Sequence, residues 1–281
     1  MALAFGITGA FAQEATGLTS KKGEPILPES GDWAISVDAA PVLNYFGRFL
    51  STAGATSPTW GYPGTPLAIT GKMFKDEKTA YRAMVRLGFG SATNNNYVQQ
   101  DAQADPTVTV KDTWKNSQHN IVLGAGIEMR KGKTRLQGYY GGMLMFGIGG
   151  MKDAYTYGNA FSKTNQTPNA TSSWNPNISG PVVSRTLENK AGSTMMLGVR
   201  GFIGAEYFIF PKIAVGAEFG WGLGMTHTGD GSKKTESWDA ANTTTKTTTM
   251  KTGGKGTFGI DTDINGSQMI PTGQLTLTMH F

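Results

Sequence analysis

The chain has 281 residues, of which 39 are glycine, none is cysteine and only 16% are charged. Glycine at about twice its usual frequency disfavours a mainly helical protein, and the absence of cysteine excludes disulfides, thiolate metal sites and cysteine nucleophiles. No apolar run reaches about 18 residues, which excludes membrane-spanning helices, and the net charge of +5 is not clustered as nucleic-acid binding requires.

Residues 1–12, MALAFGITGAFA, form an apolar segment that ends in the small-residue pattern Ala10-Phe11-Ala12. This pattern matches the apolar region and cleavage site of a secretory signal, although the basic residues that normally precede them are missing. We therefore predict a partial signal peptide over 1–12, with a first strand as the alternative. Residues 13–32 are polar and lack periodicity, which predicts an N-terminal tail before a folded domain over 33–281.

From Trp33 onward, eight segments alternate apolar and polar residues at period two, the pattern of a strand with two different faces. They are 33–40, 67–74, 80–91, 119–130, 134–148, 193–209, 213–225 and 274–281. One face of each segment is apolar, and the opposite face carries charged residues and glycine. The sequence therefore predicts an all-β antiparallel protein of eight strands.

The links between these segments alternate between short and long. The short links are 75–79, 131–133 and 210–212, and the long links are 41–66, 92–118, 149–192 and 226–273. In an up-and-down meander all the long links fall at the same end. This asymmetry is typical of outer-membrane barrels, which combine an even number of strands with short periplasmic turns and long extracellular loops. We predict an eight-stranded antiparallel up-and-down transmembrane β-barrel with four long extracellular loops.

The charged face is predicted to line the inside of this barrel, because lipid requires an apolar exterior. A soluble barrel would have the opposite arrangement, with a wet exterior and an apolar interior. Eight strands leave an interior just wide enough for side chains, so buried ions must pair and close the lumen. The predicted charge network comprises Asp38, Lys72, Arg82, Arg86, Glu128, Arg200, Glu206 and Glu218, with Arg130 and Arg135 on the same face. A narrow gated path for ions or small solutes is the alternative.

Aromatic residues are expected where the barrel meets the two membrane surfaces, because their rings settle between hydrocarbon and headgroups. The predicted girdle has Trp33, Tyr81, Tyr207, Phe210 and Phe281 at the rim with the short turns, and Trp221 towards the other rim.

Over residues 33–281 the chain resembles the small eight-stranded outer-membrane barrels, the OmpA-type transmembrane domain and its OmpX-like relatives. The resemblance rests on the strand pattern, the exported start and the alternating last strand that ends at Phe281. It implies a location in the outer membrane of a Gram-negative bacterium, contact with lipid and lipopolysaccharide, and recognition of the last strand by the outer-membrane assembly machinery. The junction AFA-QE and the richness in glycine and asparagine resemble proteins of the Bacteroidota.

No triad motif, metal-ligand spacing or cofactor fingerprint occurs in the sequence, so we predict no enzymatic activity, no cofactor and no metal site. Eight-stranded lipid A palmitoyltransferases use histidine, aspartate and serine at the barrel rim, so a rim enzyme is an alternative. We favour it less, because those enzymes hold hydrocarbon inside the barrel and the interior predicted here is charged. Its candidates are His119, His227, Asp230 and Ser232. We expect function to lie in the loops, as contact with a protein partner, with the chain an anchor or an accessory subunit of a larger outer-membrane complex.

Overall fold

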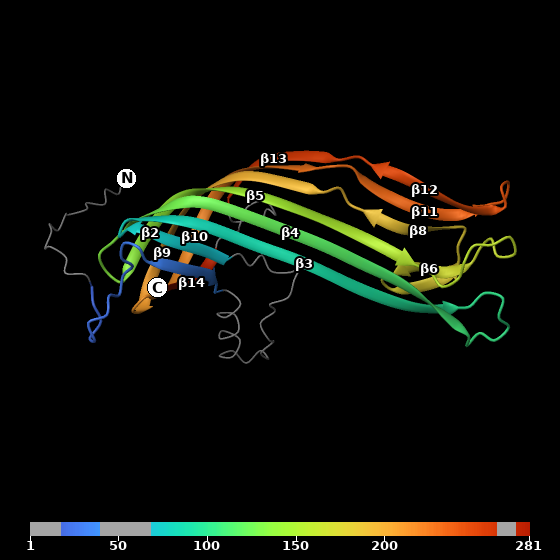
Figure 1. Ribbon diagram of the computed structural model, residues 1–281, viewed down its shortest axis with the longest axis horizontal. Coiled ribbons are helices and arrows are strands. Elements are labelled where there is room, and N and C mark those ends of the chain that lie inside the picture. Colours follow the sequence, from blue (N-terminus) through green and yellow to red (C-terminus); the bar gives the residue numbers. More distant parts are fainter. Residues whose placement is uncertain (1–17, 40–68, 263–273) are drawn as a thin grey trace, which may run out of the picture.

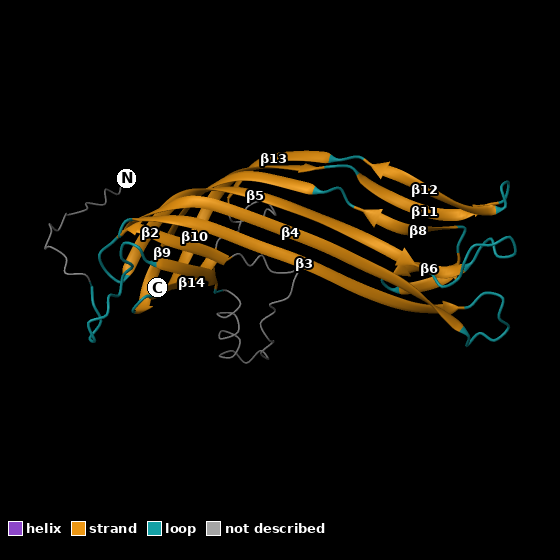
Figure 2. Ribbon diagram, viewed as in Figure 1, coloured by secondary structure: helices purple, strands orange, loops and turns teal. Residues whose placement is uncertain are grey.

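The computed structural model describes residues 18–39, 69–262 and 274–281. Within these ranges all the regular secondary structure is β-strand, and the strands pair antiparallel (Figure 2). This confirms the prediction of an all-β protein. None of these residues belongs to a helix long and apolar enough to cross a membrane. The predicted signal segment 1–12 and the predicted loop 41–66 lie outside the described residues.

Fourteen strands occur in the described ranges, and twelve of them form one sheet, whereas the sequence predicted eight strands. The strands β6 and β7 form a separate hairpin. The bounds are β1 Trp33–Asp38, β2 Ile69–Asp76, β3 Thr79–Gln99, β4 Thr109–Lys131, β5 Leu136–Thr156, β6 Asn169–Trp174, β7 Asn177–Pro181, β8 Ser184–Lys190, β9 Thr194–Phe210, β10 Ile213–Thr228, β11 Gly231–Asp239, β12 Thr244–Thr252, β13 Lys255–Thr262 and β14 Gln274–His280.

Eight strands of the large sheet pair in a ring. The order of pairing is β1, β2, β3, β4, β5, β9, β10 and β14, and β14 pairs again with β1. Ser36 on β1, for example, pairs with Thr70 on one side and with Thr278 on the other. Each of the eight predicted segments supplies one strand of this ring.

At one end the sheet continues well beyond the ring (Figure 1). The strands β3, β4 and β5 have 21, 23 and 21 residues, and β8, β11 and β12 extend the sheet beside β5. The prediction of long loops over 92–118, 149–192 and 226–273 was therefore wrong in large part, because strands occupy much of these ranges. Both faces of the sheet carry polar residues there, so hydrophobic alternation ends while backbone pairing goes on.

Glycines divide three long strands at one level of the sheet, which accounts for three of the six strands beyond the predicted eight. β8 and β9, β10 and β11, and β12 and β13 follow each other across short breaks, and β13 and β14 both pair with β10. A Cβ atom on Gly192 would lie 1.7 Å from the carbonyl oxygen of Gly229, and one on Gly254 would lie 2.3 Å from that of Thr228. Only glycine permits this approach of neighbouring backbones.

The N-terminal segment 18–32 packs against the end of the ring where short turns join β2 to β3, β4 to β5 and β9 to β10, here called the tight-turn end. The prediction of a polar tail did not include this packing. Ile26 is 1% exposed and contacts Phe208 and Ala214, and its carbonyl oxygen accepts a hydrogen bond from Lys212 N at 3.2 Å. Asp32 forms an ion pair with Lys212. The segment has no strand of its own, yet its one apolar pair, Ile26 and Leu27, lies against the end of the ring.

Replacing Ile26 by alanine is expected to weaken this contact by about 2–5 kcal/mol, because a fully buried isoleucine loses its packing. Trypsin should then cut after Lys21 and Lys22 more quickly, since these exposed residues are cleaved whenever the segment detaches. The rate of cleavage, followed on gels, measures the effect. Leu18→Ala, at an exposed position of the same segment, is the control and should cleave at the wild-type rate. Equal rates for both variants would contradict the docking.

Candidate functional site

Inward-facing side chains fill the ring in successive layers. At the tight-turn end the His280 ring lies between the Phe74 and Phe208 rings, at 5.4 and 5.2 Å between centroids. Two clusters of ions follow, and beyond them Met84, Met143 and Met145 form a buried apolar cluster. The inside of the ring is therefore packed with side chains, and many of its polar groups are charged.

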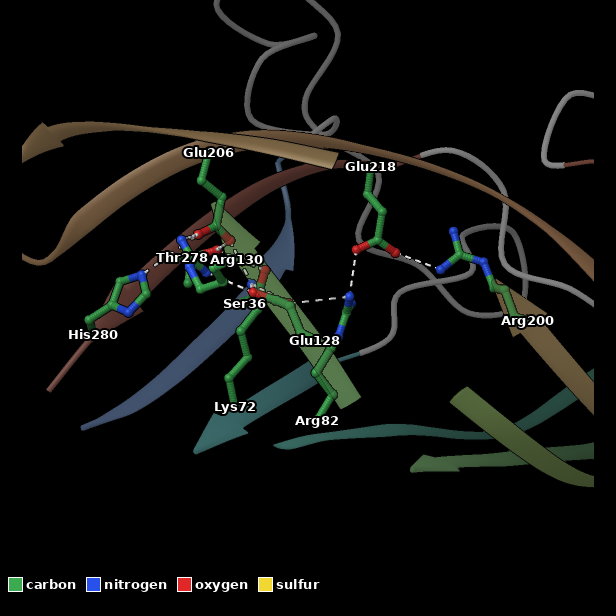
Figure 3. Close-up of polar contacts among 10 residues, drawn as sticks. All are labelled: Ser36, Lys72, Arg82, Glu128, Arg130, Arg200, Glu206, Glu218, Thr278 and His280. Atoms are coloured by element: carbon green, nitrogen blue, oxygen red, sulfur yellow. Dashed lines mark hydrogen bonds and ion pairs between the residues drawn. The ribbon is translucent and has the colours of Figure 1, made fainter. Parts of the chain in front are cut away.

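The first ion cluster joins three strands of the ring, β2, β4 and β9 (Figure 3). Glu206 accepts hydrogen bonds from Lys72 Nζ at 2.6 Å and from Arg130 Nη2 at 2.7 Å. Glu128 accepts one from Arg130 Nη1 at 2.7 Å, and its other oxygen lies 3.1 Å from Lys72 Nζ. All four side chains are at most 2% exposed.

A second cluster lies next to the first, and the two are connected. Glu218 accepts hydrogen bonds from Arg82 Nη1 at 2.7 Å and from Arg200 Nη1 at 2.5 Å. Arg82 Nη1 also lies 3.5 Å from Glu128 Oε2, which links the two clusters (Figure 3). The Arg82 guanidinium stacks over the Phe202 ring at 4.1 Å. Seven buried ionic side chains thus form one network across the ring.

Inward-facing glycines make room for these long side chains. A Cβ atom on Gly204 would lie 2.3 Å from the Tyr139 ring, and one on Gly220 would lie 2.9 Å from Arg200 Nη2. Neighbouring charged side chains can therefore lie flat across the space that a larger residue would fill. The alternation of glycine with outward apolar residues on β10 has this packing role.

Six of the eight predicted network residues lie in this network, and Arg130 joins them. The six are Lys72, Arg82, Glu128, Arg200, Glu206 and Glu218. Arg86 is half-buried further along β3, and the side chain of Asp38 lies outside what the structure describes. Arg135 instead donates hydrogen bonds to the carbonyl oxygens of Phe208 and Ile209, at 2.9 and 3.2 Å. The methionine cluster was not predicted. Strand alternation nevertheless places Met84, Met143 and Met145 on the inward faces of β3 and β5.

Large apolar side chains cover the outside of the ring. Leu87 and Leu144 are 65% and 63% exposed, and every predicted girdle residue is also exposed: Trp33, Tyr81, Tyr207, Phe210, Trp221 and Phe281. Trp33 and Phe281 exchange backbone hydrogen bonds at the tight-turn end. Trp221 pairs with Gly201 further towards the extended sheet. The arrangement is the reverse of an ordinary soluble protein, in which leucine is mostly buried and arginine is mostly exposed.

The predicted rim residues do not come together as a catalytic group. His119 lies on β4 and His227 on β10, and β5 and β9 separate these strands in the ring. Asp230 Oδ1 accepts a hydrogen bond from Gly254 N at 3.0 Å and so supports the break between β12 and β13. The part of the chain that the structure describes contains no group of three or more histidine, aspartate or glutamate side chains able to hold a metal ion.

The hairpin of β6 and β7 is held against one face of the extended sheet by buried polar groups. Asp112 on β4 accepts hydrogen bonds from the backbone and the hydroxyl of Thr171 at 2.7 and 2.9 Å. Asp153 on β5 accepts one from Trp114 Nε1 at 2.9 Å, and the Trp114 ring lies 6.1 Å from that of Trp174. This face is therefore already occupied by the chain itself, while the opposite face is uncovered by described residues.

Comparison with protein-family models gives no match, and comparison with curated protein sequences gives none either. The resemblance to small outer-membrane barrels therefore depends on the strand pattern, the apolar start and the alternating last strand of the sequence. What the structure establishes is an antiparallel all-β chain with ions inside its ring of strands and apolar residues outside.

Proposed function

We propose that the ring of eight strands is a membrane-spanning barrel in the outer membrane of a Gram-negative bacterium. The observation that carries this proposal is the distribution of side chains, with seven connected ionic groups inside and large apolar groups outside. Lipid is the solvent in which such an exterior is stable, and paired ions are tolerated inside. The outer face would contact lipid and lipopolysaccharide, and the last strand, β14, would be recognised by the assembly machinery.

The size of the apolar exterior supports this location. On β5 the outward apolar residues run from Leu136 to Ile148. These twelve steps cover about 40 Å along the strand, or about 30 Å along the barrel axis at a tilt of about 40°. The hydrocarbon core of a bilayer is about 30 Å thick. The exposed aromatic residues at the tight-turn end would then lie at the periplasmic surface.

A barrel with this interior would be closed, and its function would lie outside the membrane. The ion network and the methionine cluster occupy the space in which a channel would run. The extended sheet would project from the outer surface and present its polar strands to a protein partner, as an anchor or as a subunit of a larger complex. We propose no enzymatic activity, no cofactor and no contact with nucleic acid.

Reconstitution tests the membrane location and the closed interior separately. A folded barrel should migrate differently on gels before and after boiling, and the unboiled protein should resist extraction from vesicles. In planar bilayers we expect no steady conductance. Steady openings that disappear in Arg82→Ala or Glu206→Ala would instead favour an ion path through the ring. Failure to insert into vesicles would contradict the membrane location itself, and repeated purification from native membranes without any companion would contradict the role as a subunit.

A further inference from the structure

A row of lysines crosses the extended sheet just beyond the apolar exterior. On β5, Leu144, Phe146 and Ile148 are exposed on the outside of the ring, so Lys152 points to the same side. Lys152 pairs with Lys190 on β8, which in turn pairs with Ser232 on β11. Ser232 pairs with Lys251 on β12. Three of the four positions in this row are lysine.

The next row adds further lysines to the same face. Lys115 on β4 pairs with Ala154 on β5, Ala154 with Glu188 on β8, and Glu188 with Lys234 on β11. Glu188 forms an ion pair with Lys152, with 2.7 Å between Lys152 Nζ and Glu188 Oε2, and this contact lowers the pKa of the Glu188 carboxyl group. In these two rows the face therefore carries five lysines and one acid. We call Lys115, Lys152, Lys190, Lys234 and Lys251 the lysine face.

Two acids of the extended sheet, Asp112 and Asp153, lie on its other side. Asp112 and Asp153 face the β6–β7 hairpin, and the charge of Glu236 on β11 is already balanced by an ion pair with Arg185 at 2.6 Å. Lys152 and Lys190 stand directly opposite each other, and like charges at such positions are mutually unfavourable. An anion bound between them would remove this repulsion. The excess of lysines over acids in these two rows thus favours a negatively charged ligand on the lysine face.

A cleft lies where the lysine face meets the apolar exterior. Its volume is about 470 Å³, and its lining includes Phe89, His119, Gly150, Lys152 and Lys190. The His119 ring lies over Gly150, and a Cβ atom there would come within 2.8 Å of His119 Cε1. The hollow thus lies beside a glycine and a histidine ring, and it combines an apolar edge with two lysine side chains.

We propose that the lysine face binds the phosphate groups of phosphorylated outer-leaflet lipid, with one headgroup in the cleft between Lys152 and Lys190. This inference rests on the proposed membrane location. A lipid headgroup fits better than free phosphate, because the apolar exterior begins at Phe89 and continues without interruption below the lysines. Acyl chains would lie against that exterior while the lysine side chains reach the phosphates at the membrane surface.

The test compares lipid A that carries two phosphates with the same lipid after its phosphates have been removed. The full chain is folded in detergent, and bound lipid is measured by native mass spectrometry. The double variant Lys152→Ala/Lys190→Ala should bind the phosphorylated lipid about 10- to 30-fold more weakly, since each lysine near an anionic surface contributes appreciably. Lys233→Ala/Lys246→Ala removes two exposed lysines from the opposite face of β11 and β12 and is the matched control.

Each outcome decides a different point. Equal binding of phosphorylated lipid by the wild type and by Lys152→Ala/Lys190→Ala would overturn the inference, as would an equal loss in the control variant. Full displacement of the lipid by inorganic phosphate at matched concentration would show a site for free phosphate instead. Glu188→Gln should tighten lipid binding several-fold, because it removes the carboxylate that is paired with Lys152. Shifted gel mobility on boiling establishes that each variant is folded, so failure of the membrane proposal is detected separately.

Discussion

Replacing Glu206 by glutamine is expected to lower the free energy of unfolding by about 3–5 kcal/mol, because it leaves buried cations without their counter-charge. Glu206 holds Lys72 at 2.6 Å and Arg130 at 2.7 Å, and it is 0% exposed. Glutamine has nearly the same shape, so the change removes charge without creating a cavity. Unfolding in urea of the protein folded into phosphatidylcholine vesicles, followed by tryptophan fluorescence, measures the loss.

Glu77→Gln is the matched control for this substitution. Glu77 is exposed in the turn between β2 and β3, and the same change there should alter stability by less than about 0.5 kcal/mol. If Glu206→Gln were as stable as the control, the ion pairs around Glu206 would contribute nothing to holding the ring together. The closed interior would then be supported only by the space that its side chains fill.

Leu144→Arg is expected to destabilise the vesicle-inserted protein by about 2–4 kcal/mol, the penalty for arginine on the lipid side of a barrel near the bilayer centre. Leu144 is 63% exposed and lies within the run of outward apolar residues on β5. In water an arginine at so exposed a position would be nearly neutral. The sign and size of the effect therefore distinguish lipid from water around the ring.

Thr247→Arg provides the comparison for this variant. Thr247 is exposed on β12, in the extended sheet that we place outside the membrane, and arginine there should change stability by less than about 0.5 kcal/mol. Equal stability of the two variants in vesicles would contradict the proposal that the ring spans a membrane, whatever the fate of the ion network.

Strand alternation predicted the ring and most of its interior because the two faces of each strand meet different surroundings. On β9, for example, Arg200 and Glu206 share one face while Val199 and Ile203 share the other, and the structure buries the first pair and exposes the second. Shifting a strand by one residue would have exchanged its inward and outward faces. Because the alternation fixed the inward face of each strand, six network residues could be identified from the pattern alone.

Neither the extended sheet nor the docked N-terminal segment could be predicted in this way. In β12 all nine residues are exposed, so nothing in the pattern of TTKTTTMKT distinguishes a strand from a loop. Its pairing with β11 depends on backbone hydrogen bonds, which every residue except proline can form in full. The position of Ile26 depends on contacts with Phe208 and Ala214, nearly two hundred residues away in the chain. Such partners are set by tertiary packing, which no local pattern records.

The breaks near Gly192, Gly229 and Gly254 affect one half of the sheet only, since the ladders between β3, β4 and β5 continue across that level without interruption. The two halves should therefore differ in stiffness. A force on the far end of the sheet would be transmitted by the continuous strands β3, β4 and β5. The divided strands on the other side would bend at their glycines. A load applied to the extended sheet by a bound partner would thus reach the ring mainly through β3, β4 and β5.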